Sequence, residues 1–218
     1  LAEAERRMLQ AAYFGAGMVR AGDAGAMVTG QNLNYPRALR PPLDVGGPSP
    51  DVAVAGIYMM VSHTTTLFFA DCTVNIDPDP VRLAEIAIAT ADFVRGLGIV
   101  PQVAMLSSSN FGSVRHPKQA KVAEAVRRLH EIRPALAVDG EMQADTAVVE
   151  SILQGRYPFS RLQTAANVLI FPDLNAANIC YKLLGRLGGA QAIGPILVGM
   201  AEPIQVLERD SGVEDIVN

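Results

Sequence analysis

The chain has 218 residues, half of them hydrophobic and 18% charged, which is enough apolar material to bury one large core or two smaller ones. With 6% aromatic residues and no Trp, it suits an aliphatic α/β core better than an all-β sandwich. The net charge is −4 and no basic stripe with interleaved aromatic residues occurs, which argues against a nucleic-acid partner. No apolar run approaches the ~20 residues of a membrane-spanning helix, and no signal-peptide pattern opens the chain.

Two further features of the composition concern the compartment and the ends of the chain. Cys72 and Cys180 lie far apart within apolar runs, which predicts buried, reduced thiols and a cytoplasmic protein. The first residue is Leu1, so we expect the chain to be part of a longer polypeptide.

The first fifty residues predict a helix, a short strand and a proline-rich connection. Apolar residues at helical spacing predict an opening helix over residues 1–22 that stops at Gly22. Residues 24–30 predict a short buried strand, and the three prolines within 34–45 indicate a structured loop or a short helix. The sequence GGPSP at 46–50 resembles a linker, so we expect a domain boundary near it.

The remaining chain predicts strands that alternate with helices. Two apolar, β-rich runs at 55–62 and 66–74, joined by the polar sequence HTTT, favour an antiparallel hairpin. Further strands are expected over 102–107, 135–140, 167–172 and 194–199. Helices are expected over 77–99, 118–132, 144–153 and 175–188, and a last one within VEDIVN at the end. The expected fold class is therefore α/β with a mainly parallel sheet.

Polar clusters follow three of the expected strands. They are SSSN at 107–110, DGEMQAD at 139–145 and PDLNAAN at 172–178. In open parallel sheets, ligands bind outside the carboxyl ends of the strands, so three clusters on one edge favour a ligand cleft there. The alternative is that these residues cap helices and form turns, which also require Ser, Asp and Asn.

Several stretches resemble the phosphate acetyltransferase (phosphotransacetylase) family. They are FADCTVNIDP, DGEMQADTAVV, the run from NVLIFPDLNAANICYKLL to GPILVGMAEPI, and the closing ERDSGVEDIVN. The resemblance covers nearly the whole chain. More narrowly, GMVRAGDAGAMVTGQNLNYPRALRP and SSSNFGS resemble the copy of this domain at the C-terminus of bacterial hybrid NADP-dependent malic enzymes.

The resemblance implies a three-layer α/β/α fold, similar to that of isocitrate dehydrogenase, with a second subdomain inserted into the first. Residues 46–195 would form the inserted subdomain, and residues 1–45 and 196–218 would belong to the first, with the ligand cleft between the two. It also implies a homo-oligomer, at least a dimer, and a malic enzyme part on the same polypeptide, upstream of Leu1.

Acetyl transfer from acetyl phosphate to coenzyme A (CoA) needs a base for the thiol proton and a cation for the phosphate group. The resemblance assigns the phosphate to Arg209 and the base to Asp215, and it matches Arg40 to a further substrate-binding arginine. Without the resemblance, Asp215 would be a first-turn carboxylate that favours the helix dipole, and Arg209 a surface cation.

One position departs from the family motif: Glu208 stands where the family has a serine before the arginine. A carboxylate removes the hydroxyl donor and places a like charge near acetyl phosphate, at a cost of about 3 kcal/mol at ~5 Å and an effective dielectric of ~20. Glu208 would equally be able to pair with Arg209. The leading interpretation is therefore a regulatory domain of a malic enzyme that binds acetyl-CoA without turnover. An active phosphate acetyltransferase and a purely structural oligomerisation module are the alternatives.

Three side chains that follow the strand at 167–172 are further candidates for binding acetyl-CoA or CoA. Asn175 and Asn178 come just after the strand end, and Lys182 lies one turn further along the expected helix. As alternatives, Asn175 would cap that helix and Lys182 would be a solvated charge. The three histidines fall in different elements without ligand spacing, so no metal site is expected, and no dinucleotide or P-loop motif indicates another cofactor.

Overall fold

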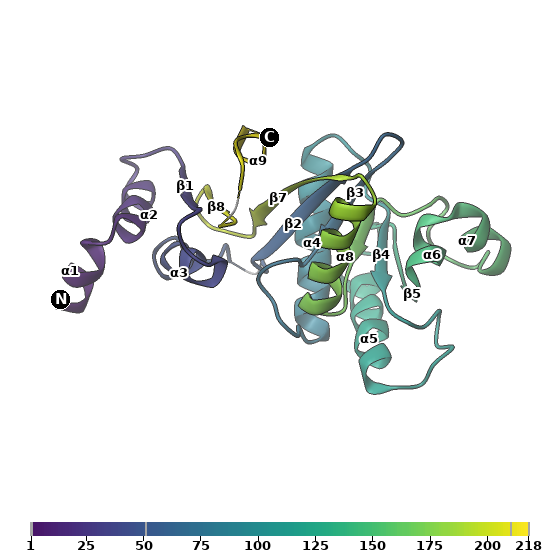
Figure 1. Cartoon of the computed structure of the whole chain (residues 1–218). Coiled ribbons are helices and arrows are strands. Elements are labelled where there is room, and N and C mark those ends of the chain that lie inside the picture. The colour runs from purple at the N-terminus through teal and green to yellow at the C-terminus, as the bar shows by residue number, and fades with distance from the viewer. Residues whose placement is uncertain (1, 51, 210, 218) are drawn as a thin grey trace.

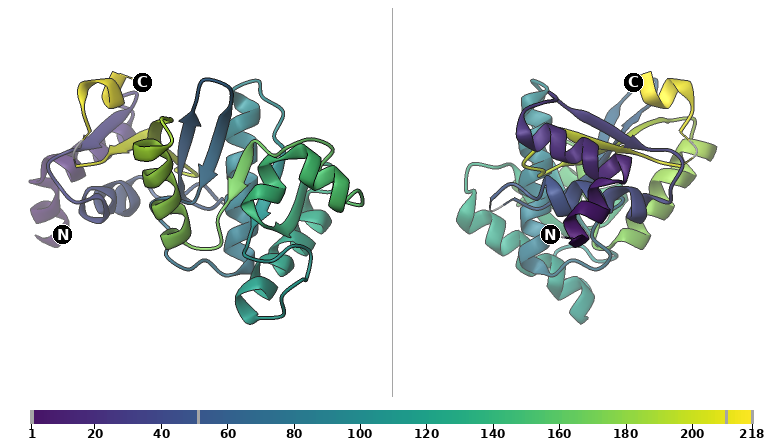
Figure 2. Two further views of the ribbon diagram at one scale, coloured as in Figure 1. Left: turned by 45° about the vertical axis from the view of Figure 1, so that its right-hand side comes forward. Right: turned by 90° about the vertical axis from the view of Figure 1, so that its left-hand side faces the viewer.

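The structure is a computed structural model that describes residues 2–50, 52–209 and 211–217, and of Asp215 only the backbone. It has two parts that lie side by side, one around a two-stranded sheet and one around a six-stranded sheet (Figure 1). Both ends of the chain lie in the part with the two-stranded sheet, as the rotated views show (Figure 2).

The smaller part combines the first fifty residues with the last twenty. Its elements are α1 (Ala2–Met8), α2 (Ala11–Ala21), β1 (Met27–Gly30), α3 (Tyr35–Val45), β8 (Ile204–Leu207) and α9 (Val213–Val217). β1 and β8 pair in parallel, with Met27 opposite Ile204. Ala16 and Val19 of α2 pack on Ile204, so one face of this sheet is covered by a helix.

Several expectations for this part are corrected by the structure. The predicted single helix over 1–22 is two helices, because the chain breaks at Leu9, whose side chain is 87% exposed. Gly22 does end α2, in the left-handed conformation that glycine adopts readily. β1 is not a buried strand: Val28 is 64% exposed, since the two-stranded sheet has an open face. The strand β8 was not predicted at all.

The proline-rich segment forms the short helix that was one of the two alternatives. Asn34 caps α3, because its side chain accepts a hydrogen bond from the backbone N–H of Arg37. Pro36 lies at the start of the helix, where a missing N–H costs nothing, while Pro41 and Pro42 lie inside it.

The larger part is a sheet with strand order β5-β4-β6-β3-β2-β7. Its strands are β2 (Ala55–Val61), β3 (Thr66–Ala70), β4 (Val103–Leu106), β5 (Val138–Met142), β6 (Val168–Ile170) and β7 (Gln191–Val198). β2 runs antiparallel to both β3 and β7, whereas β3, β6, β4 and β5 pair in parallel. The predicted α/β class, the mainly parallel sheet and the β2–β3 hairpin are thus confirmed.

Helices cover both faces of this sheet. They are α4 (Pro80–Gly96), α5 (Pro117–Ile132), α6 (Ala144–Val148), α7 (Glu150–Arg156) and α8 (Leu174–Leu187). α4 and α5 pack with Ile57 and Phe68 on one face, and α6 to α8 pack with Tyr58 and Phe69 on the other. The helix predicted over 144–153 is two helices, because Val149 has an extended backbone.

The three polar clusters do follow neighbouring strands, because β5, β4 and β6 are adjacent and parallel. Asn110 and Gln143 join two of the clusters through two hydrogen bonds of 2.8 and 2.9 Å. In the third cluster, Asp173 caps α8 by accepting from the N–H of Ala176. The alternative in which Asn175 caps this helix was therefore wrong.

The larger part begins and ends at paired residues, since Ala55 lies opposite Val198. The expected boundary at 195/196 falls inside β7, and the division into two subdomains stays a prediction.

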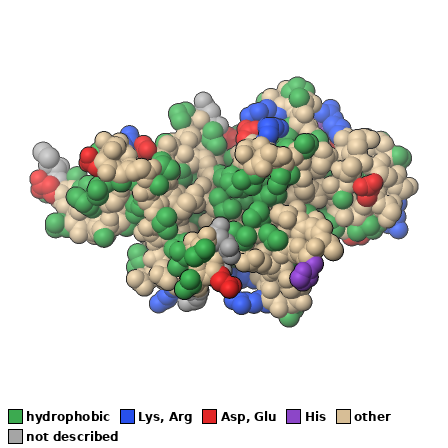
Figure 3. Space-filling model, turned by 90° about the horizontal axis from the view of Figure 1, so that it is seen from above, with side chains coloured by type: hydrophobic (Ala, Val, Ile, Leu, Met, Phe, Trp, Pro, Cys, Tyr) green, Lys and Arg blue, Asp and Glu red, His purple; other side chains and the backbone are tan. Residues whose placement is uncertain are grey.

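On the face seen in Figure 3, hydrophobic side chains gather in the middle, and Lys and Arg side chains lie scattered along the margins. None of the helices in the described part of the chain has the length and apolar character that crossing a membrane requires.

Candidate active site

Glu208 follows β8 directly and contacts α8, so it joins the two parts of the molecule. Its Oε1 accepts a hydrogen bond of 2.9 Å from the hydroxyl of Tyr181, and its Oε2 lies 3.7 Å from Nζ of Lys182. The expected pairing of Glu208 with Arg209 is not what the structure shows: among the described residues, its ionic partner is Lys182. The contact between Lys182 and Glu208 brings two of the predicted site residues together.

Tyr181 is a partner of Glu208 that the sequence did not predict. Its ring stacks on that of Tyr58 with centroids 4.0 Å apart and an interplanar angle of 16°. Burial, followed by the charge of Glu208, raises the pKa of the Tyr181 hydroxyl above its ordinary value, so it stays a donor at neutral pH. Nothing local in the sequence marks this tyrosine, because its partner lies on another element and it reads as an ordinary core residue.

The cation and the base of the predicted motif lie in the segment after Glu208. Arg209 is exposed, and within the described residues its side chain makes no hydrogen bond or ion pair. The hydroxyl of Ser211 donates a hydrogen bond to the backbone carbonyl of Glu208 over 3.0 Å. α9 begins at Val213, as the sequence predicted, and contains Asp215, whose side chain lies outside the described part.

Arg40 does not join this group. Its Nε is 2.9 Å from Oδ1 of Asp44 within α3, and its side chain is 68% exposed. The other oxygen of Asp44 accepts from Arg7 and from the hydroxyl of Tyr13, each over 2.8 Å. These contacts make Arg40 part of a surface ion-pair network between α1, α2 and α3, and its predicted role in binding substrate stays a prediction.

Asn175, Asn178 and Lys182 lie three and four residues apart, so they share one face of α8. Lys182 brings that face to Glu208. Asn175 is exposed and Asn178 half-buried, and among the described residues neither side chain makes a hydrogen bond. The face of α8 that contacts Glu208 thus presents amide and ammonium groups, which can bind the phosphates and amides of a nucleotide-like ligand.

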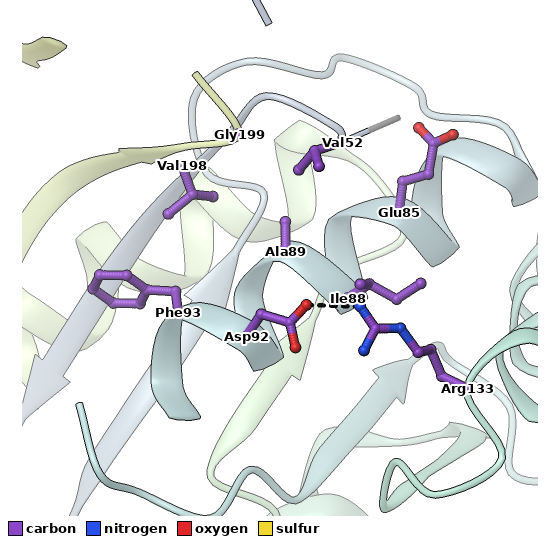
Figure 4. A pocket seen from close by; sticks show the side chains of 9 residues that line it. All are labelled: Val52, Glu85, Ile88, Ala89, Asp92, Phe93, Arg133, Val198 and Gly199. Atoms are coloured by element: carbon purple, nitrogen blue, oxygen red, sulfur yellow. Dashed lines mark hydrogen bonds and ion pairs between the residues drawn. The ribbon is translucent and has the colours of Figure 1, made fainter. Parts of the chain in front are cut away.

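A cavity of about 520 Å³ lies elsewhere, between α4 and the end of β7 (Figure 4). Its wall is largely apolar, with Ala89, Phe93 and Val198 among the lining residues. Its charged groups are already paired: Asp92 bonds Arg133 over 2.9 Å, the dashed line in Figure 4. This cavity contains none of the predicted site residues, so we do not place the chemistry there.

Within the described ranges, no group of three or more His, Cys, Asp or Glu side chains is arranged to hold a metal ion.

The sequence is similar to that of a family of known proteins. The family model described as "Phosphate acetyl/butaryl transferase" matches residues 1–218. The chain belongs to the phosphate acetyl/butaryl transferase family. It is 39% identical over 217 residues to the phosphate acetyltransferase of Bacillus subtilis, covering 99% of this chain and 67% of that protein. It is 41% identical over 213 residues to that of Acetivibrio thermocellus, covering 94% of this chain and 64% of that protein.

Solved structures of this family agree with the fold. A phosphotransacetylase from Streptococcus pyogenes superposes with a TM-score of 0.89 at 40% identity, covering 94% of this chain and 63% of that one. The chain therefore spans about two thirds of the length of these family members. They are named phosphate acetyltransferase or phosphotransacetylase, which favours the active-enzyme alternative over the regulatory domain of a malic enzyme.

Proposed function

We propose that this chain carries the acyl-transfer site of a phosphate acetyltransferase, which moves an acetyl group between acetyl phosphate and the thiol of CoA. The observation that carries the proposal is the match of the family model over residues 1–218, together with about 40% identity to proteins named for this activity. The reduced thiols of Cys72 and Cys180 suit the cytoplasm, where we place the reaction.

In the proposed reaction, the CoA sulfur attacks the carbonyl carbon of acetyl phosphate. The bond from that carbon to the phosphate oxygen breaks, and inorganic phosphate leaves with the electron pair. Asp215 takes the thiol proton, since the thiolate is the nucleophile and a free thiol titrates near a pKa of about 8.5. Arg209 binds the phosphate with its planar guanidinium. Both roles come from the family motif.

We place CoA along the face of α8 that carries Asn175 and Asn178, with Lys182 at the end of that face where the two substrates meet. The contact of Lys182 with Glu208 supports this placement, because it brings that face to the segment with Arg209 and Asp215. A ligand held there would contact both parts of the molecule. Such a position suits a transfer reaction, because the two substrates must meet in a site that excludes water.

A second candidate is the regulatory domain of an NADP-dependent malic enzyme that binds acetyl-CoA without turnover. The observation in its favour is Glu208, which puts a carboxylate where the family motif has a serine. Under this candidate, acetyl-CoA would alter the activity of the parent enzyme through its different affinities for two states of the assembly. A structural oligomerisation module without a ligand is the third.

The test is the formation of acetyl-CoA from acetyl phosphate and CoA by the full-length protein. We expect turnover by the wild type, a loss of at least about 100-fold in Asp215→Asn because the base is removed, and little change in the neighbouring control Glu214→Gln. No turnover by the wild type, with acetyl-CoA still bound in a calorimetric titration, would replace this proposal by the regulatory candidate. Absence of both turnover and binding would leave the structural module.

A further inference from the structure

The two oxygens of the Glu208 carboxylate have different partners. Oε1 accepts from the Tyr181 hydroxyl over 2.9 Å, a normal hydrogen-bond length. Oε2 is 3.7 Å from Nζ of Lys182, near the upper limit for an ion pair, and the two side chains are 33% and 52% exposed. An exposed ion pair at this distance contributes little to stability and breaks easily. The Tyr181 contact is therefore the firm one and the Lys182 contact the loose one.

Tyr181 is itself held in place. It is 4% exposed and stacked on Tyr58, which is 3% exposed. A ring packed in this way cannot follow a moving carboxylate, so its hydroxyl fixes Oε1 at one point. Lys182 is on a flexible stem, and its Nζ also lies 4.9 Å from the centroid of the Tyr181 ring. Loss of the Oε2 contact would leave this ammonium near the same place.

The charges around Glu208 favour the binding of an anion that carries more negative charge than a carboxylate. Lys182 and the exposed Arg209 are both cations, one in contact with Glu208 and the other next to it in the chain. A phosphate group carries more negative charge than a carboxylate and offers more acceptor oxygens, so it gains more from an ammonium and a guanidinium. Glu208 opposes its binding by like-charge repulsion at short range.

We propose that Glu208 is an internal counter-ion that holds Lys182 when no ligand is bound and yields it to the phosphate group of a ligand, while Tyr181 keeps the carboxylate in position. The inference rests on the proposed function and extends it, because it adds Lys182 to the phosphate-binding groups and gives Glu208 and Tyr181 defined roles. Tyr181 is a positioning residue in this arrangement. The repulsion from Glu208 weakens phosphate binding and so speeds the release of inorganic phosphate after transfer.

The test is a calorimetric titration of the full-length protein with inorganic phosphate at constant ionic strength, with no turnover required. Glu208→Gln keeps an acceptor for Tyr181 but removes the charge, so the Kd for phosphate should fall about tenfold. Lys182→Met should raise the Kd about tenfold. Tyr181→Phe keeps the stacked ring but releases Oε1, so the carboxylate competes more freely and the Kd should rise about threefold.

A matched control is Glu85→Gln. Glu85 is 31% exposed and has a cationic partner, Arg82 at 2.9 Å, but it lies on α4, on the other face of the sheet. Its substitution changes the net charge by the same amount and should leave the Kd for phosphate unchanged, since exposed charges beyond about 10 Å are screened. An equal effect in this control would reduce the Glu208 result to net charge and overturn the proposal.

A double-mutant cycle tests the exchange itself. In a Lys182→Met background, Glu208→Gln should lower the Kd for phosphate by less than about fivefold, instead of about tenfold. The reason is that the ammonium for which Glu208 and phosphate compete is no longer present. The proposal would be overturned if Glu208→Gln lowered the Kd for phosphate by the full tenfold in the Lys182→Met background. It would also be overturned if Tyr181→Phe lowered the Kd instead of raising it. The assay for acetyl-CoA formation tests the proposed reaction separately. If the protein turns over but these shifts in Kd are absent, only the counter-ion role of Glu208 is rejected. If the shifts occur without turnover, only the proposed reaction is rejected.

Discussion

The hydroxyl of Tyr181 donates to Oε1 of Glu208 over 2.9 Å. Tyr181 lies in α8, which packs on the six-stranded sheet, and Glu208 directly follows β8 of the two-stranded sheet. One hydrogen bond thus connects the segment that carries Arg209 and Asp215 to the face of α8 that carries Lys182. This contact brings residues that are far apart in the sequence to one place.

Replacing Glu208 by serine should raise the proposed acetyltransferase activity. The substitution removes a like charge beside the phosphate of acetyl phosphate and restores a neutral hydroxyl donor, so we expect kcat/KM for acetyl phosphate to rise about tenfold. The measurement is the initial rate of acetyl-CoA formation by the full-length protein, with Glu85→Ser as the control on the opposite face. A lower rate in Glu208→Ser would mean that the carboxylate itself assists the transfer.

The buried carboxylate of Asp71 should be a major contributor to stability. It is 3% exposed and accepts only from N–H donors. They are the backbone N–H groups of Gly56, Thr73, Val74 and Asn75, and the side-chain amide of Asn75. Asp71→Asn turns an N–H₂ group toward these donors, so the free energy of unfolding in urea should fall by roughly 2–4 kcal/mol.

The control for this prediction is Asp79→Asn. Asp79 caps α4 by accepting from the N–H of Arg82 over 2.8 Å, and Asn caps helices about as well as Asp. The same chemical change should therefore cost little at this position. Equal losses at Asp71 and Asp79 would contradict the role given to the buried network.

Glu141 should hold the segment 107–116 in its observed conformation. Its Oε1 accepts from the hydroxyl of Ser109 over 2.8 Å and from the N–H of Gly112 over 2.7 Å, and its side chain is buried. Glu141→Ala removes both contacts, so hydrogen exchange of amides in this segment should quicken by about tenfold or more. Amides of α8 serve as the internal reference. Unchanged exchange at Gly112 would show that backbone contacts alone fix the segment.

Tyr35 should affect stability mainly at alkaline pH. Among the described residues its buried hydroxyl has no hydrogen-bond partner, so Tyr35→Phe should leave the free energy of unfolding at pH 7 unchanged or raise it by up to about 1 kcal/mol. Burial raises the pKa of Tyr35 from 10.0 to about 12. Because the folded state holds the proton more tightly, this group's contribution to stability is full below pH 10 and is lost as the pH rises toward 12.

Urea unfolding of the wild type and of Tyr35→Phe between pH 7 and pH 12 checks this prediction. The variant should lose less stability than the wild type between pH 10 and pH 12. Equal alkaline losses in the two proteins would show that Tyr35 titrates in the folded state as it does in the unfolded chain.

Local signals in the sequence were sufficient for most of the larger part. The Asp-Pro sequence before α4 and the apolar runs on either side of HTTT predicted a helix and a hairpin that the structure contains. Such signals depend on neighbouring residues, since caps, prolines and hydrophobic periodicity act within one or two turns. The alternation of strands and helices then limits the topology to a mainly parallel sheet.

Tertiary contacts decided the features that sequence reasoning missed. β8 has four residues and is stabilised by pairing with β1, which lies near the other end of the chain. Glu208 was expected to pair with its neighbour Arg209, but α8 offers Tyr181 and Lys182 across the boundary between the two sheets. No pattern within a few residues contains that information. The family motif located the segment, and the structure supplied its partners.

The pairing of β1 with β8 has a consequence for the order in which the molecule folds. The two strands lie near opposite ends of the chain, so an unfolded chain must close a very long loop to bring them together. Once the six-stranded sheet is complete, Ala55 and Val198 are neighbours, and the loop that remains is short. The two-stranded sheet, and with it the junction at Glu208, should therefore assemble last, so a nascent protein can complete the candidate site only after residues 204–208 have been synthesised.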